Sequence, residues 1–222
     1  MAEDGPQVDA LSSVAQDYLK VIWSATEWGD PPITTKALAA RLGTTPANVS
    51  ETLRRLDSQG LVHYEPYRPA RLSASGRRLA LAMVRRHRLL EAFLAGMVGY
   101  SWDEVHDEAE RLEHAVSDDF LDRIDALLGF PTHDPHGDPI PAPDGRTPAT
   151  DDTLRLPDAP PGRYLVVRVS DADSATLARL TAAGFAPGAV VPEAPEGLQS
   201  GDLDAVRVTV APGDPLSPGS RS

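Results

Sequence analysis

The residues with the clearest chemical potential lie in one short stretch near the middle of the chain. Glu110 follows His106 by four positions, Glu113 follows Glu110 by three, and His114 follows Glu110 by four. Residues three or four positions apart share one face of a helix, so these four side chains are brought together. Imidazole and carboxylate groups are typical donors to divalent metals. The spacing predicts a metal-binding face, and an exposed face of salt-bridged charges is the alternative.

Further donor positions accompany this stretch. His87 and Glu91 are four residues apart on a preceding predicted helix, and Asp17 lies beside the apolar residue Tyr18 near the N-terminus. The chain has no cysteine, which excludes thiolate ligands, disulfides and thiol nucleophiles. Histidine and carboxylate donors suit Mn²⁺, Fe²⁺, Co²⁺ or Zn²⁺, and the excess of carboxylates favours the harder ions.

Motifs of catalytic metal sites are absent from the sequence. Neither the His-Glu-x-x-His pattern of zincins nor the His-x-x-Glu-His pattern of inverzincins occurs. The duplicated Glu-x-x-His of di-iron helical bundles is also missing. A metal-dependent hydrolase is therefore only an alternative interpretation, and no catalytic residue is assigned. We interpret His133 and His136, in a proline-rich segment, as solvated linker residues.

The elements that must position these donors are mainly helical. Residues 9–28 carry apolar side chains at three- and four-residue intervals, which is typical of an amphipathic helix. Gly43 and Gly60 follow two shorter predicted helices, where C-terminal caps belong. The predicted helices cover 9–28, 35–42, 46–59, 75–98, 102–115 and 117–128, and predicted strands cover 61–65 and 70–73.

Two short helices followed by a hairpin form a winged helix-turn-helix layout. The chain has a formal net charge of −12, yet residues 36–88 hold eleven basic and only three acidic residues. This surplus of positive charge is typical of a DNA-binding face, and a merely solvated basic face is the alternative. The predicted DNA contacts are Lys36, Thr45, Ala47, Asn48, Ser50, Glu51, Arg54, Arg55, Arg68 and Arg71.

Helical periodicity stops after about residue 128. Nine prolines within residues 131–162 indicate a linker, and later β-rich segments predict a small β module. No stretch approaches the ~18 apolar residues of a membrane span, and the N-terminus lacks the layout of a signal peptide. We therefore expect a cytoplasmic protein without a membrane partner.

Four segments carry motifs that occur together in one protein family. They are Met83-Val-Arg-Arg-His-Arg-Leu-Leu-Glu91, Val105-His-Asp-Glu-Ala-Glu-Arg-Leu-Glu-His-Ala-Val-Ser-Asp118, Thr44 to Val62, and Phe130-Pro-Thr-His-Asp-Pro-His-Gly-Asp-Pro-Ile-Pro141. On these motifs the chain resembles the diphtheria-toxin-repressor family of metal-dependent transcriptional repressors over about residues 9–145. Residues 163–211 resemble the family's third, SH3-like domain more loosely.

The resemblance completes the expected architecture, which is mainly α with small β elements. The expected parts are a winged helix-turn-helix DNA-binding domain over 1–73, a helical metal-binding and dimerisation domain over 74–145, a Pro-rich linker over 146–162, an SH3-like β module over 163–211, and a disordered tail over 212–222.

The resemblance also implies two adjacent metal sites. The primary site would comprise Asp17, Glu110, Glu113 and His114; the ancillary site would comprise His87, Glu91 and His106, with Asp173 contributed by the third domain. Iron-sensing members place Met and Cys at positions 17 and 110, whereas this chain has Asp and Glu, as in the manganese-sensing branch. Short manganese sensors carry Glu where this chain has Lys20. The implied cofactor is Mn²⁺, with Fe²⁺, Co²⁺ or Zn²⁺ as substitutes.

The implied function is manganese-dependent repression of metal-uptake genes by a homodimer bound to double-stranded operator DNA, with one or two dimers per operator. Metal held between Asp17 and the dimerisation helices would fix two recognition helices at ~34 Å, one turn of DNA. The alternatives are an iron-responsive repressor of the same architecture, a metal-independent winged-helix regulator of a small molecule, and the hydrolase named above.

Overall fold

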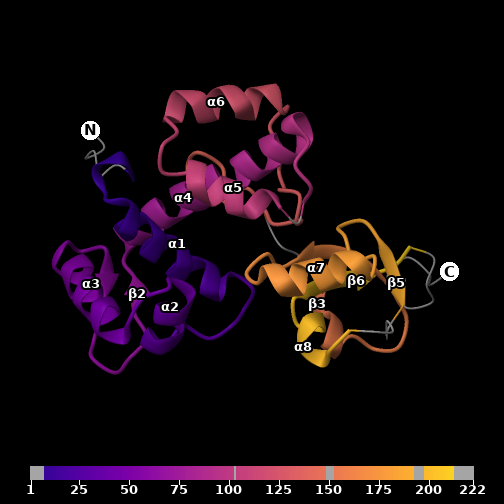
Figure 1. Cartoon of the computed structure of the whole chain (residues 1–222), viewed down its shortest axis with the longest axis horizontal. Helices are drawn as coiled ribbons and strands as arrows, with labels where there is room; N and C mark the ends of the chain where they lie inside the picture. The colour runs from indigo at the N-terminus through magenta and orange to yellow at the C-terminus, as the bar shows by residue number, and fades with distance from the viewer. Residues whose placement is uncertain (1–7, 103, 149–152, 193–197, 213–222) are drawn as a thin grey trace. The chain divides into compact units, whose positions relative to one another are not determined.

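A computed structural model describes residues 8–102, 104–148, 153–192 and 198–212 (Figure 1). The predicted disordered tail lies almost wholly outside these residues. The chain divides into two compact units. The first unit comprises 1–87, 113–115 and 141–146, and the second comprises 88–112, 116–140 and 147–222.

The first unit contains a winged helix-turn-helix. Helix α1 (Ser13–Glu27) precedes α2 (Thr35–Arg41) and α3 (Pro46–Ser58), and a hairpin of β1 (Val62–His63) and β2 (Arg71–Leu72) follows. The side chains of Thr34 and Thr45 accept hydrogen bonds from backbone N–H groups in the first turns of α2 and α3. Gly43, with φ of +60°, allows the sharp turn between the two helices. The predicted layout is confirmed.

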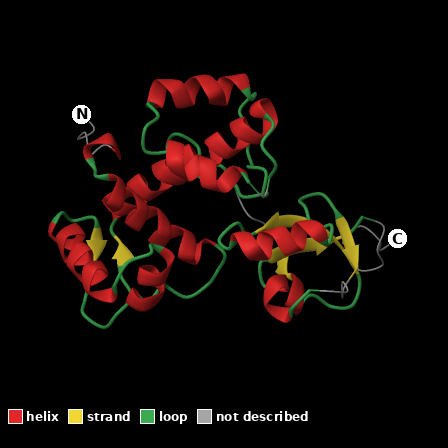
Figure 2. Cartoon of the chain, viewed as in Figure 1, coloured by secondary structure: helices red, strands yellow, loops and turns green. Residues whose placement is uncertain are grey.

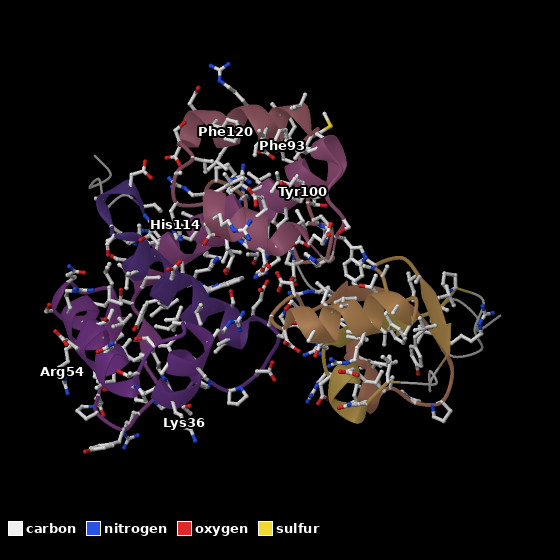
Figure 3. The ribbon with its side chains drawn as sticks, in the orientation of Figure 1. Lys36, Arg54, Phe93, Tyr100, His114 and Phe120 are labelled. Carbon is white, nitrogen blue, oxygen red and sulfur yellow. The ribbon has the colours of Figure 1, made fainter. Side chains whose placement is uncertain are left out.

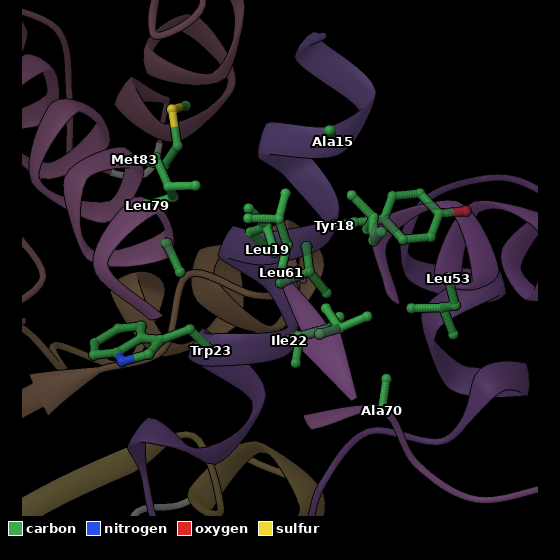
Figure 4. Close-up of a cluster of buried hydrophobic side chains, with 14 of the residues drawn as sticks. Ala15, Tyr18, Leu19, Ile22, Trp23, Leu53, Leu61, Ala70, Leu79 and Met83 are labelled. Carbon is green, nitrogen blue, oxygen red and sulfur yellow. The ribbon is translucent and has the colours of Figure 1, made fainter. Parts of the chain in front are cut away.

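The core of the first unit fixes the crossing of these helices. Leu19 of α1 and Val49 and Leu56 of α3 are completely buried. Figure 4 shows the side chains of α1 meeting those of α3, the hairpin and the first turns of the next helix. Because these apolar residues recur at helical spacing, one stripe per helix is enough to form the core.

The next elements belong to the predicted helical domain. They are α4 (Ala74–Phe93), a π-helical turn η2 (Leu94–Val98), α5 (Val105–Leu112) and α6 (Asp118–Leu127). In Figure 2 they form the helical part of the chain that follows the hairpin. Helix α5 is shorter than the predicted 102–115, so Glu113 and His114 lie in the turn beyond its end.

The C-terminal part of the second unit is a four-stranded antiparallel sheet of order β3-β6-β4-β5. Its strands are β3 (Leu154–Arg155), β4 (Arg163–Val169), β5 (Val190–Pro192) and β6 (Val206–Val210). Helices α7 (Ser174–Ala182) and α8 (Ser200–Leu203) accompany it. The predicted linker contributes β3 and a 3-10 turn, Leu156–Asp158, whose Leu156 is buried in the core of this sheet. Among the described residues, no helix is both long and apolar enough to cross a membrane.

A glycine on α4 gives a direct test of the packing around the hairpin. A Cβ at Gly76 would lie 1.9 Å from the carbonyl oxygen of Leu61, which is backbone and cannot rotate away. We therefore expect Gly76→Ala to lower the free energy of unfolding by ~1–3 kcal/mol in denaturant titrations. The control is Gly201→Ala, because nothing lies within 4 Å of a Cβ there. Equal stability of both variants would contradict the described packing.

Candidate metal centres and DNA interface

The first candidate metal centre joins α1 to the turn after α5. The Oδ1 atom of Asp17 lies 3.0 Å from Nε2 of His114, and Glu113 Oε1 lies 3.7 Å from the same nitrogen. One ligand atom from each of the three residues lies within 4.8 Å of the others. Glu113 is fully buried, whereas Asp17 and His114 are partly exposed. Two carboxylates and an imidazole at this separation form a donor set that fits a divalent cation of intermediate hardness.

Two basic side chains hold Glu113 in place. The Nζ atom of Lys20 donates to Oε1 at 2.5 Å, and Nδ1 of His87 lies 2.6 Å from Oε2. Burial raises the pKa of Glu113, but the hydrogen bond from His87 and the positive charge of Lys20 outweigh it and lower the pKa below the usual value. The buried carboxylate is therefore ionised, and each of its oxygens faces a basic group.

Two predicted ligands also contact residues of the other predicted set. Glu110, predicted in the primary set, has a side chain that is 53% exposed and lies 3.6 Å from His106 of the ancillary set. His87, predicted in the ancillary set with Glu91 one turn along α4, also contacts Glu113. The structure thus brings together Asp17, Glu113 and His114 of the predicted primary set.

The second candidate centre lies in the second unit. The Nδ1 atom of His106 lies 2.8 Å from Asp171 Oδ2 and 3.3 Å from Glu91 Oε1. Glu91 and His106 were both predicted, and Asp171 was not. The predicted Asp173 is exposed and caps α7, since its Oδ2 accepts hydrogen bonds from the backbone N–H and the hydroxyl group of Thr176. The third domain therefore places a carboxylate beside His106 two residues earlier than predicted.

A third group of donors extends this centre. Glu91, Asp134 and His136 are all buried, and their ligand atoms lie within 4.8 Å of one another. The interpretation of His136 as a solvated residue is wrong, because its side chain is completely buried and Nε2 bonds to the carbonyl oxygen of Trp102 at 2.6 Å. The signal in the sequence was the alternation of Asp134, His136 and Asp138 among prolines, which has no helical period.

Charge dominates the chemistry of the second centre. Burial lowers the pKa of His106, but hydrogen bonds to Asp171 and Glu91 raise it to about 11. Burial also lowers the pKa of His136, but the contact with Glu91 outweighs this effect and raises the pKa to about 10. Burial and the neighbouring carboxylates of Asp138 and Glu91 raise the pKa of Asp134 well above its usual value. Without bound protons or a cation, the carboxylates of this centre would carry more negative charge than the neighbouring basic groups neutralise.

The predicted DNA-reading residues lie at the surface of the first unit. All of the predicted contacts except the half-buried Ser50 are exposed. Figure 3 shows Lys36 and Arg54 at the outer edge of this part of the chain. Some of the polar groups have local partners: the Thr45 hydroxyl accepts from the Asn48 N–H, and the Ser50 hydroxyl donates to the carbonyl oxygen of Pro46. The side-chain amide of Asn48 donates to the Thr44 hydroxyl, and Arg68 lies 3.4 Å from Glu65, whereas Arg54 and Arg55 are exposed on α3.

An exposed apolar surface covers α6 and the end of η2. Its large side chains are Met97, Val98, Phe120, Leu127 and Phe130, of which Phe130 is 68% exposed. Phe120 also packs edge-to-face against Phe93 of α4, with ring centroids 6.3 Å apart (Figure 3). Large apolar side chains exposed on neighbouring elements favour an interaction surface there.

A winged helix-turn-helix combined with imidazole–carboxylate centres defines a metal-dependent DNA-binding protein. Two family profiles match the chain. They are described as "Iron dependent repressor, N-terminal DNA binding domain", over residues 10–70, and "Iron dependent repressor, metal binding and dimerisation domain", over residues 73–142.

Individual relatives extend the similarity over most of the chain. The iron-dependent repressor IdeR of Mycobacterium tuberculosis (strain ATCC 25618 / H37Rv) is 35% identical over 196 residues, which cover 83% of this chain and 85% of that protein. A solved structure described as a manganese-dependent transcriptional repressor in complex with manganese is 45% identical, with a TM-score of 0.80, and covers 89% of this chain and 100% of its own. The structure of the manganese regulator SloR is 28% identical, with a TM-score of 0.75, and the match covers 89% of this chain and 98% of that chain. The chain belongs to the diphtheria-toxin-repressor family of metal-dependent transcriptional repressors and is not an enzyme.

The raised pKa values of His106 and His136 predict a pH dependence. Protonation of both histidines stabilises the metal-free fold fully below pH ~6.5, and this stabilisation falls as pH rises towards the folded-state pKa values of about 11 and 10. The unfolding free energy of chelator-treated protein should therefore decrease from pH 6.5 to pH 9. His136→Gln should weaken this dependence, and the control His133→Gln, at an exposed histidine, should preserve it. Identical pH profiles for both variants would contradict the assignment.

Proposed function

We propose that this protein is a manganese-dependent transcriptional repressor in which bound Mn²⁺ activates a homodimer for operator binding. The observation that carries the proposal is the convergence of Asp17, Glu113 and His114. Asp17 lies on α1, whose buried face packs against the recognition helix α3, whereas Glu113 and His114 lie beyond α5. A cation shared by these residues would connect the DNA-binding unit to the metal-binding domain.

The donor chemistry supports Mn²⁺ over softer ions. The described candidate centres offer carboxylate and imidazole groups, and the chain has no thiolate to offer. The similar solved structure is described as manganese-dependent and in complex with manganese, although it is a different protein at 45% identity. We propose Asp17, Glu113 and His114 as the ligands of the activating site, with Glu110 kept as a ligand predicted from sequence alone.

We propose the second centre as a site that ties the third domain to the helical segment. Glu91, His106 and Asp171 would hold the cation, and Asp134 and His136 offer further donors beside Glu91. Asp171 takes the place that the sequence match gave to Asp173. When bound, a divalent ion would neutralise buried carboxylates that otherwise depend on protonated histidines.

Iron is the second candidate activator, because curated relatives at about 35% identity are named iron-dependent repressors. Operator binding titrated with Mn²⁺ and, under anaerobic conditions, with Fe²⁺ separates the two. Stimulation by Mn²⁺ at lower free metal concentration supports the proposal. Stimulation by Fe²⁺ alone would replace manganese by iron while leaving the rest of the scheme in place.

Removing one ligand tests the coupling. Asp17→Ala deletes a carboxylate from the first centre, and its side chain is not part of the buried core. We expect the Mn²⁺-stimulated affinity for operator DNA to fall by at least tenfold in gel-shift titrations, with the circular dichroism spectrum unchanged. Asp107→Ala, at an exposed position on α5, is the matched control and should bind as the unmodified chain does. Full stimulation of Asp17→Ala by Mn²⁺ would contradict the scheme.

The exposed apolar surface on α6 is proposed as the dimer interface. Leu127 is 58% exposed, so a charged substitution there costs the monomer little but disfavours burial against a second copy. Sedimentation equilibrium should show Leu127→Glu shifted towards monomer by tenfold or more in Kd. The control is Leu154→Glu, at a leucine on β3 that is 41% exposed. An unchanged dimer constant for Leu127→Glu would place the interface elsewhere.

A further inference from the structure

A segment of the metal-binding and dimerisation domain, Asp134–Asp138, lies directly on strand β4 of the third domain. The N–H of Val169 donates to the carbonyl oxygen of His136 at 2.9 Å. At Gly137, whose φ is +83°, an added Cβ would lie 2.0 Å from the carbonyl oxygen of Val167. The two backbones therefore approach so closely that only glycine fits between them.

A β-bulge turns one arginine of β4 towards this segment. Val166 pairs with Val208 and Arg168 pairs with Arg207, so Val167 is an extra residue on β4. Val166 and Val169 contribute to the hydrophobic core of the third domain, whereas Arg168 does not. Bulges commonly re-aim a side chain in this way. The guanidinium group is nevertheless buried, with only 3% of Arg168 exposed, so it depends on a charged partner.

Asp138 is that partner, and it faces a second arginine as well. The Nε atom of Arg168 donates to Asp138 Oδ1 at 2.5 Å. Arg88 of α4 lies 3.7 Å from the other carboxylate oxygen, Oδ2, and donates to the carbonyl oxygen of Pro139 at 2.8 Å. Asp134 steadies the turn, because its Oδ1 accepts from the N–H groups of His136 and Asp138, and its Oδ2 lies 3.4 Å from Nε of Arg88. The buried carboxylate of Asp138 thus lies between an arginine of α4 and an arginine of β4.

We propose that Arg88, Asp138 and Arg168 form a metal-independent latch that holds the third domain on the helical segment and positions Asp171 for metal. Asp171 follows Arg168 by three residues, at the end of β4, and its carboxylate lies 2.8 Å from His106. None of the three latch residues is a proposed ligand, so their contacts with one another do not require a cation. The part of the inference that concerns metal rests on the proposed role of the second centre, and the docking part does not.

The latch can be broken without touching a ligand. Arg168→Gln removes the positive charge that β4 places beside the buried Asp138. A buried carboxylate that loses this charge strongly disfavours the docked state. Arg168→Lys retains the charge but loses the planar fork and should be intermediate. The matched control is Arg155→Gln, which removes an exposed arginine–aspartate pair, Arg155–Asp204, from the same sheet. All variants are made in the full chain.

The first readout is docking in the presence of chelator. Hydrogen exchange of the segment 134–138 should be at least tenfold faster in Arg168→Gln than in the unmodified chain, and unchanged in Arg155→Gln. Gly137→Ala alters only the segment and leaves the third domain's own core intact, so it should accelerate the same exchange while β6 stays protected. Unchanged exchange in both Arg168→Gln and Gly137→Ala would overturn the latch.

The second readout is the affinity for Mn²⁺, measured by electron paramagnetic resonance. Arg168→Gln should weaken binding at the second centre by about tenfold, leave the Asp17 centre unaffected, and recover partly in Arg168→Lys. Asp171→Ala should lose the same binding without faster exchange in metal-free protein. Normal Mn²⁺ affinity in Arg168→Gln despite undocking would overturn the positioning role. Normal affinity in Asp171→Ala with undocking in Arg168→Gln would instead reject the proposed second centre and support the latch.

Discussion

The structure depends on compensating the charge of carboxylates that are buried away from water. Glu113 and Glu91 are completely inaccessible to solvent, and Asp134 and Asp138 are nearly so. A buried negative charge is costly unless hydrogen bonds and positive groups surround it. Lys20 and His87 provide these for Glu113, and Arg88 and Arg168 provide them for Asp138. Glu91 faces His106 and His136, and Asp134 faces Arg88.

This division gives the two centres different characters. At Glu113, a lysine ammonium group is already hydrogen-bonded to one carboxylate oxygen, so the local charge is partly compensated before any cation arrives. At Glu91, compensation comes from His106 and His136, whose raised pKa values reflect the surrounding negative charge. Metal binding at the proposed second centre would therefore release protons, whereas metal binding at the proposed first centre would depend on the position of α1.

Much of the fold could be predicted because it follows from local periodicity. Apolar stripes and glycine caps located the helices of the DNA-binding unit within a few residues. Charge segregation along the chain predicts a basic face on the same unit. Asp17 and His114 are 97 positions apart, and only the resemblance to a family connected them before the structure did. Helical spacing could not show that Glu113 lies beyond the end of α5, in contact with His87.

Residues outside regular elements were harder to predict. Asp171 was missed because it lies in a loop, where no periodic pattern separates it from Asp173, whose residue type also suits the N-cap of α7. His136 was misassigned because prolines suggested a linker, although a close backbone contact at Gly137 buries the whole segment. β3 was missed because two residues carry no periodicity.

The central claim is that metal at the Asp17 centre fixes the spacing of two recognition helices in a dimer. Because the chain has no cysteine, Gln59→Cys places a single dye at the exposed C-terminal end of each α3. Single-molecule energy transfer between donor- and acceptor-labelled protomers reports their separation. We expect a broad distribution of separations with chelator and a narrow one with Mn²⁺, and the narrowing should be absent in Asp17→Ala. The same distribution with and without bound Mn²⁺ would contradict it.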